Sequence, residues 1–338
     1  MAGHIRAMIQ RADRHARNKE YLCLFPGCQK KAIRSHAIPR ALCIEALADN
    51  GVVFSRRQSL NGAMHMTDPT DPPEVVEIGV NDASTFKGYC SFHDTRLFVS
   101  AETNERHKKN GMFIAHHLRA ISVEYCRKRQ VLDFHKKFLE LTSPGAERED
   151  LKNLFKQQEI IFSAFGEVYL GSILNLIGGS DVDSVDYFCI PFSRNIQVSC
   201  CGCFDAVPGQ FDSMICYNLI SHADMSMLVL TNFTVVKHYL DSFVRSYDLP
   251  RGTERLVNDI AFAHCEEPLI GARLWRSLHA DQKLLVRLSL RHPDVRSFTP
   301  TLRVIRLART DFPTQLTPSL LARLPTKLDQ VNLGHHNI

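Results

Sequence analysis

The sequence predicts a mixed α+β fold, and three observations point to it. Long stretches place apolar residues at helical spacing, most clearly in residues 1–19, 103–141 and 150–176. Four short apolar runs between residues 187 and 231 are bounded by turn residues, the pattern of an antiparallel sheet. Two clusters of cysteine and histidine stand in the N-terminal third of the chain. We therefore expect an N-terminal module built around these clusters, a long basic helix, and a C-terminal antiparallel sheet with helices.

The N-terminal part predicts short elements around the two clusters. Residues 1–19 favour a basic helix whose apolar side holds Ile5, Met8, Ile9 and Ala16. The dipeptide Pro26-Gly27 predicts a turn inside the first cluster. The other elements expected here are a helix over 39–47, strands over 52–54 and 75–80, and a helix over 91–101.

The rest of the chain, after residue 102, divides at a run of turn residues, Thr142-Ser143-Pro144-Gly145. Before it lies a long helix over 103–141, and after it come a helical stretch, the predicted sheet, and helical spacing again over 234–291. We therefore predict three segments: a metal-binding module with an N-terminal helix over 1–102, a basic helical connector over 103–142, and an α+β domain over 143–338. The last segment is expected to recognise a target, a partner or a ligand.

The charge of the chain is uneven. Residues 1–140 hold 22 Lys and Arg against 15 Asp and Glu, together with nine of the sixteen histidines. A basic N-terminal portion suits a phosphate-binding surface, although an ordinary solvated face is the simpler interpretation of charge alone. No secretory signal and no membrane-length apolar stretch is evident, so we expect a cytoplasmic protein without a membrane partner. In that compartment cysteines favour metal ligation or packing over disulfides.

The two clusters supply the ligand set of a closed tetrahedral zinc site. Cys23 and Cys28 are separated by four residues, and Cys90 and His93 by two. Three thiolates and one imidazole are typical zinc ligands, and two close pairs separated by a long insertion form a site once the chain folds. The alternative is that the thiols are merely buried and His93 lies at the surface. For Cys200, Cys201 and Cys203 no matching second pair follows, and we expect simple packing.

The order of motifs resembles the zinc-bearing HNH (His-Me finger) endonucleases. The motifs that carry the resemblance are the first cysteine pair, Ser35-His36-Ala37-Ile38-Pro39, and Cys90-x2-His93-Asp94 at the start of a helix, covering roughly residues 20–102. The resemblance implies a module similar to a treble clef, with a ββα arrangement around the metal. Proteins with this layout often serve in bacterial or phage defence, which is an analogy of layout.

The resemblance also implies roles for individual residues. His36 matches the general base that activates water, and Asp94 stands where the family places its last catalytic metal ligand. Asn81 and Ser84 are both candidates for the middle position of the motif. Ser35 departs from the pattern, because the family usually has a metal-binding aspartate or a second histidine there.

The chemistry expected from these residues is hydrolysis of a nucleic-acid phosphodiester. A carboxylate such as Asp94 suits Mg²⁺ or Mn²⁺, and a neutral histidine near pH 7 can take a proton from the attacking water. The departure at Ser35 keeps an alternative open: a non-catalytic zinc module for nucleic-acid or protein binding.

The long basic helix is the expected nucleic-acid contact. Its basic residues would follow a phosphate backbone without reading sequence if they share one face. A plain exposed helix is the alternative, and His116-His117 on the same helix are expected to be solvated or to face phosphate. DNA is preferred to RNA as the partner, and a protein partner or a homo-oligomer is also compatible with the sequence. The residues expected to contact nucleic acid are Arg106, Lys108, Lys109, Arg127, Lys128 and Arg129.

Overall fold

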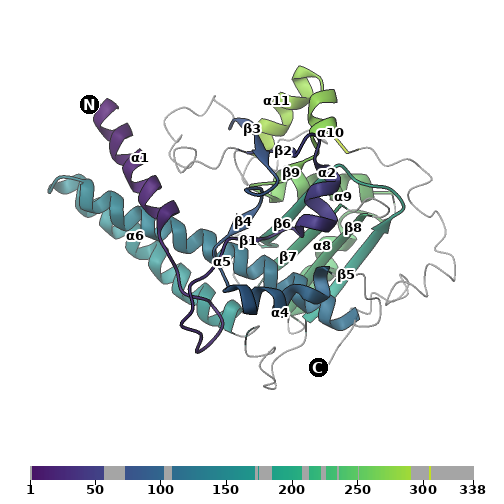
Figure 1. Cartoon of the computed structure of the whole chain (residues 1–338), viewed down its shortest axis with the longest axis horizontal. Coiled ribbons are helices and arrows are strands. Elements are labelled where there is room, and N and C mark those ends of the chain that lie inside the picture. Colours follow the sequence, from purple (N-terminus) through teal and green to yellow (C-terminus); the bar gives the residue numbers. More distant parts are fainter. Residues whose placement is uncertain are drawn as a thin grey trace.

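The computed structural model confirms a mixed α+β fold (Figure 1). It describes residues 2–56, 73–102, 109–171, 174, 185–207, 213–221, 226–233, 236–249, 251–290 and 304–305. The larger sheet has the strand order β3-β2-β9-β6-β7-β8-β5, and its described neighbours all pair antiparallel. Its strands are β2 (Val52–Arg56), β3 (Val75–Gly79), β5 (Val185–Phe192), β6 (Val198–Asp205), β7 (Met214–Ile220), β8 (Ser226–Phe233) and β9 (Leu269–Ile270).

Period-two alternation places the two faces of this sheet in different cores. Met214 and Cys216 of β7 belong to the core beneath α5 (Lys109–Leu141). Ile215, Tyr217 and Leu219 point to the opposite core. That second core is covered by α8 (Lys237–Arg245), α9 (Thr253–Asp259), η6 (Ile260–His264), α10 (Ala272–Ser277) and α11 (Ala280–Ser289). Three of the four apolar runs predicted as strands are confirmed as β5, β7 and β8. The run predicted at 196–198 meets β6 only at Val198, and Cys200 and Cys201, which follow it, are buried packing residues of β6.

The sheet crosses the predicted segment boundaries. β2 comes from the N-terminal segment, and it pairs with β9 through Phe54 and Ile270. β9 in turn pairs with β6. This two-residue strand gives no period that a sequence pattern could detect, and it joins the hairpin β2–β3 to the rest of the sheet.

Three helices form an arm that extends from the sheet (Figure 1). α1 (Ala2–Asn18) and α6 (Ala146–Phe165) both pack on the C-terminal half of α5, and η3 (Gly166–Gly171) continues α6. Their shared core holds Ala12 and Ala16 of α1 with Phe134 and Phe138 of α5. Ile5 was expected on the apolar side of α1 but is 46% exposed, and Ala12 is fully buried in its place.

Residues 113–123 of α5 are all buried. This part of the helix runs between the sheet and α4 (Ser91–Glu102), so its polar residues are enclosed as well. The expectation that His116 and His117 are solvated is wrong: they are 1% and 0% exposed. The Nδ1 atom of His117 lies 2.9 Å from Thr231 Oγ1 on β8, and burial lowers the pKa of His116 to about 3.

The remaining elements are short and position the cysteine and histidine clusters. They are β1 (Ser35–His36), η1 (Arg40–Ile44), α2 (Glu45–Leu47) and β4 (Thr85–Phe86). β1 and β4 form a separate two-stranded antiparallel sheet in which His36 lies opposite Thr85. Within the described chain, the helices include no segment with the length and apolarity needed to cross a membrane.

Candidate metal centre

The first ligand pair lies on a tight turn. Residues on either side of the turn pair through an isolated bridge between Leu22 and Lys31, and the Cys23 amide donates to the Lys30 carbonyl at 2.9 Å. The Cys28 amide then donates to the Phe25 carbonyl at 3.0 Å. Gly27 has φ +75°, which a residue without a side chain adopts at little cost. The Pro26-Gly27 dipeptide therefore produces the predicted turn and brings both thiols to one side.

The second ligand pair begins α4. Cys90 directly precedes this helix, and the Asp94 amide donates to the Cys90 carbonyl at 2.9 Å, so His93 lies one turn further on the same side. The two clusters are held together by backbone bonds from Leu24 to Gly88 (2.9 Å) and from Ile33 to Tyr89 (2.7 Å). The Tyr89 hydroxyl also lies 2.7 Å from Ser122 Oγ, which fastens this segment to α5.

The four ligand atoms have the spacing of a tetrahedral site. Cys23 Sγ and Cys90 Sγ each lie 3.4 Å from His93 Nδ1, and the Cys28 and Cys90 sulfurs are 3.9 Å apart. All four atoms lie within 4.8 Å of one another. Tetrahedral zinc bonds of about 2.3 Å to sulfur and about 2.0–2.1 Å to nitrogen require separations of about 3.8 Å between sulfurs and about 3.6 Å between sulfur and nitrogen. The four residues therefore lie close enough to hold a metal ion, and their spacing is consistent with a structural zinc.

Burial and packing also suit a bound cation. Cys23 and Cys90 are 7% and 3% exposed, and the Phe25 ring stacks on the His93 imidazole with centroids 4.0 Å apart. Burial raises the pKa of the Cys23 thiol to about 11, whereas the His93 amide lowers the pKa of Cys90. Burial and the nearby Arg96 lower the pKa of His93, which keeps the imidazole in the neutral form that a metal ion requires.

His36 lies on β1, which pairs with β4 shortly before the second ligand pair in the sequence. Its Nδ1 atom is 2.9 Å from the Ala83 carbonyl oxygen, so Nδ1–H donates and Nε2 carries the lone pair. Burial lowers the pKa of His36, and the cationic Arg40 and Arg34 lower it further. The imidazole is therefore neutral near pH 7 and has one nitrogen available to accept a proton.

The other predicted catalytic positions differ in their surroundings. Ser84 has φ +53°, and its carbonyl accepts the Ala37 amide at 2.7 Å. Asn81 is exposed in the turn that follows β3, and Asp94 is half-buried in the first turn of α4. Ser35 is 3% exposed, and its hydroxyl has no hydrogen-bond partner among the described residues. In the part of the chain that is described, the cysteine and histidine centre is the one group of three or more metal-ligating side chains.

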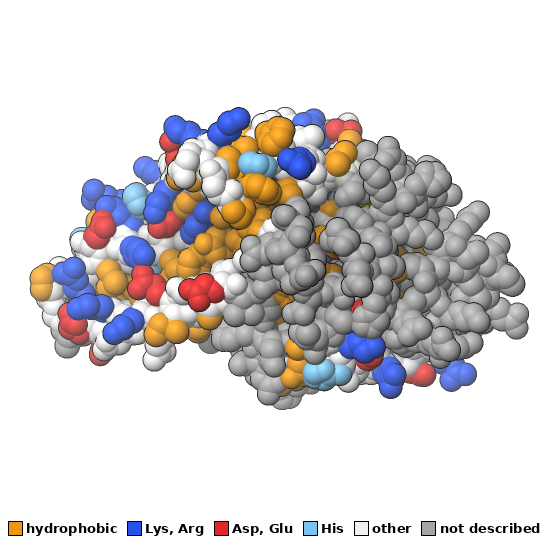
Figure 2. Space-filling model, turned by 90° about the horizontal axis from the view of Figure 1, so that it is seen from below, with side chains coloured by type: hydrophobic (Ala, Val, Ile, Leu, Met, Phe, Trp, Pro, Cys, Tyr) orange, Lys and Arg blue, Asp and Glu red, His pale blue; other side chains and the backbone are white. Residues whose placement is uncertain are grey.

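The basic residues of α5 are engaged within the molecule. Arg127 pairs with Glu267 at 3.2 Å, and Lys128 pairs with Glu124 at 3.0 Å. The Arg129 guanidinium lies 3.8 Å from the centroid of the Tyr21 ring. Lys109 begins α5, whereas Arg106 and Lys108 lie outside the described residues. In Figure 2 the Lys and Arg side chains of the helical arm are interspersed with Asp and Glu and do not form one basic surface.

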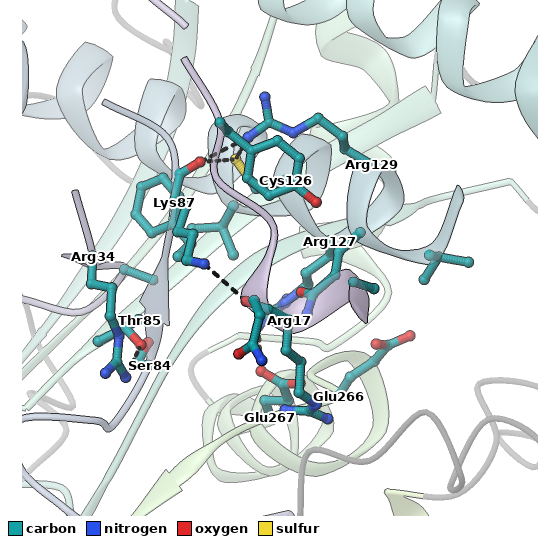
Figure 3. A pocket seen from close by; sticks show the side chains of 18 of the residues that line it. Arg17, Arg34, Ser84, Thr85, Lys87, Cys126, Arg127, Arg129, Glu266 and Glu267 are labelled. Carbon is teal, nitrogen blue, oxygen red and sulfur yellow. Dashed lines mark hydrogen bonds and ion pairs between the residues drawn. The ribbon is translucent and has the colours of Figure 1, made fainter. Parts of the chain in front are cut away.

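A cavity of about 580 Å³ opens between the end of α1, the β1–β4 hairpin, the middle of α5 and the segment after η6 (Figure 3). One side of the cavity is lined by Ala37, Ser84 and Thr85, in or next to the β1–β4 strand pair. Another side is lined by Glu266 and Glu267. Sequence reasoning missed this cavity because its cationic residues are scattered along the chain. They are Arg17, Arg34, Arg56, Lys87, Arg127 and Arg129.

Comparisons with known proteins found no match, so the function has to be inferred from the residues described above. No protein-family model, no curated protein sequence and no solved structure matches the chain.

Proposed function

We propose that the chain is a metal-dependent endonuclease that cleaves nucleic-acid phosphodiesters, with DNA as the first substrate to test. The observation that carries this proposal is the bond between His36 Nδ1 and the Ala83 carbonyl, next to the β1–β4 strand pair. A half-buried, neutral imidazole whose orientation the backbone fixes has the properties of a general base. The resemblance of residues 20–102 to HNH endonucleases supports the same role.

In the proposed reaction, His36 Nε2 takes a proton from a water molecule whose oxygen attacks phosphorus. The bond from phosphorus to the leaving sugar oxygen breaks, and that oxygen is then protonated. The nearby Arg40, Arg34 and Arg119 help to keep His36 neutral, as a base must be before it accepts a proton. Asp94 would contribute its carboxylate to a bound Mg²⁺ or Mn²⁺, which neutralises charge on the phosphate when present.

The proposed metal of the cysteine and histidine centre is zinc, in a structural role. Elemental analysis of the purified chain should give one zinc per molecule. Cys23→Ser and Cys90→Ser should lower that content, whereas Cys189→Ser, which changes a half-buried thiol of β5, should leave it unchanged. Full zinc content in both ligand variants would overturn the assignment.

The nuclease proposal is tested by incubating the full chain with plasmid, linear DNA and RNA in the presence of Mg²⁺ or Mn²⁺. Wild-type protein should cut at least one of them, and His36→Ala should lose about 100- to 10,000-fold in rate. Asp94→Asn should also lose activity, and His238→Ala, at an exposed site on α8, is the matched control. Intact substrates in all three arms, with one zinc bound, would overturn the proposal.

One observation favours a second candidate, a non-catalytic metal module that binds nucleic acid or protein. The described residues assemble the four-ligand centre but bring no further group of three ligands together around Asp94. If wild-type protein binds DNA or RNA in a gel-shift assay and cuts neither, this candidate replaces the first.

A further inference from the structure

The cavity next to the β1–β4 strand pair is lined by more cationic side chains than carboxylates. Arg127 is paired with Glu267, and the exposed Arg34 is paired with Asp82 at 2.7 Å. Arg17 is paired with Asp13 at 2.9 Å. The remaining cations of the lining are bonded to carbonyl oxygens, which orient a charge without neutralising it. Lys87 Nζ donates to the carbonyls of Arg17 (2.8 Å) and Lys19 (2.9 Å).

Arg129 and Arg56 are held in the same way. Arg129 donates to the Lys87 carbonyl at 2.8 Å, and Arg56 donates to the Leu290 carbonyl at 3.1 Å. Across the described residues, neither of these guanidiniums nor Lys87 forms an ion pair with a carboxylate. In Figure 3 the ammonium group of Lys87 reaches the backbone carbonyl of Arg17, and the Arg17 side chain continues toward Glu267.

An anion would complete this arrangement. Burial and the like charge of Arg34 lower the pKa of the Lys87 ammonium group, and the nearby Glu20 offsets part of this effect. Guanidinium and ammonium groups bind phosphate oxygens through strong charge-assisted hydrogen bonds. A phosphate between Lys87 and the arginines would therefore replace repulsion between cations with attraction to a shared anion.

The rest of the lining indicates what the phosphate is attached to. Glu266 and Glu267 offer carboxylates that repel a polyphosphate but accept hydrogen bonds from amino groups. The apolar and aromatic side chains of Tyr21, Phe86 and Val123 complete the wall. The volume lies within the range of about 300–1,000 Å³ that is usual for ligand pockets.

We propose that this cavity binds one nucleotide unit, with the phosphate at Lys87 and Arg34 and the base toward the glutamates. The unit could come from a free nucleotide or from a strand. Because Thr85 in its lining lies opposite His36, a strand held here would pass the candidate base. The proposal that the unit belongs to a nucleic-acid strand rests on the proposed nuclease function. The proposal that the cavity binds a nucleotide does not.

The test measures binding to the full chain without added Mg²⁺ or Mn²⁺, so that no cleavage interferes. Calorimetry with the four nucleoside monophosphates and fluorescence anisotropy with a short labelled oligonucleotide provide two arms. Lys87→Met and Arg34→Gln should each weaken the affinity in at least one arm by about ten- to a hundredfold. Arg34 is an exposed residue, so its variant tests the proposal even if Lys87→Met perturbs folding.

Lys152→Met, at an exposed site on α6, is the control and should bind like wild type. If the cavity variants bind the oligonucleotide more weakly than wild type, the bound unit belongs to a strand. If they bind only the monophosphates more weakly, the ligand is a free nucleotide. Equal affinity of wild type and both cavity variants in both arms would overturn the proposal, as would inorganic phosphate binding as tightly as every nucleotide. His36→Ala should retain nucleotide binding while losing cleavage, which separates failure of this proposal from failure of the nuclease.

Discussion

The Nδ1 atom of His36 lies 2.9 Å from the carbonyl oxygen of Ala83, across the turn that leads into β4. This contact fixes which ring nitrogen holds the proton and which can accept one. It involves a backbone carbonyl, so no side-chain substitution at position 83 removes it directly.

The first prediction concerns the pH dependence of cleavage. Burial and the neighbouring arginines lower the pKa of His36, so its neutral, active form persists below the ordinary histidine value of about 6.5. The cleavage rate should therefore stay constant as the pH falls through about 6.5 and decline only at lower pH. A rate profile at fixed divalent ion checks this. A midpoint above about 6.5 would contradict the role of His36.

The second prediction concerns removal of the metal. The four ligands join the 23–28 turn to the start of α4, and without a cation three neighbouring thiols and a histidine lose their shared partner. A strong chelator should lower the free energy of unfolding by several kcal/mol and increase hydrogen exchange in residues 20–33 and 88–94. Zinc added back should restore both. Unchanged exchange in these segments after the metal has been removed would contradict a structural role.

The third prediction concerns acid stability. The pKa of His116 is about 3 in the folded chain, below its value in the unfolded chain, so the unfolded state takes up a proton first as the pH falls. The contribution of neutral His116 to the free energy of unfolding is complete above about pH 6.5. It is lost progressively at lower pH, by about 2–3 kcal/mol at about pH 4.5. His116→Gln should lose less stability over this interval than wild type in urea unfolding. His15→Gln, an exposed change on α1, is the control, and equal slopes for wild type and His116→Gln would contradict the prediction.

The fourth prediction concerns the anchor between the N-terminal segment and α5. Asp133 is 8% exposed, accepts the Tyr21 hydroxyl at 2.7 Å and pairs with Lys19. A double-mutant cycle with Tyr21→Phe and Asp133→Ala should give a coupling of about 1.5–3 kcal/mol, because this bond has a charged acceptor and is partly shielded from solvent. The exposed pair of Lys31 and Glu20 should show no measurable coupling in the same assay. Additive effects at Tyr21 and Asp133 would show that the bond is not formed in solution.

Local patterns predicted the parts of the fold that depend on neighbouring residues. The alternation of Ile215, Cys216 and Tyr217 placed a strand correctly, and the spacing of Cys23 and Cys28 placed a turn with two thiols on one side. Both outcomes follow from geometry within a few residues.

The errors arose where distant segments decide the environment. Nothing near His117 in the sequence shows that β8 covers one side of its helix. Likewise Arg127 reads as a free cation because Glu267 is far along the chain. The cavity was missed for the same reason, since α1, β2, α5 and the residues next to β1 and β4 each contribute only one or two of its charges. The roles of His36, Asp94, Asn81 and Ser84 stay predictions.

The short strand β9 sets an order of events during synthesis. Because Leu269 and Ile270 link β2 to β6, the N-terminal hairpin cannot join the main sheet until nearly all of the described chain has left the ribosome. Until then the edge of β2 is open, and a nascent chain with an unpaired edge strand is prone to mispairing.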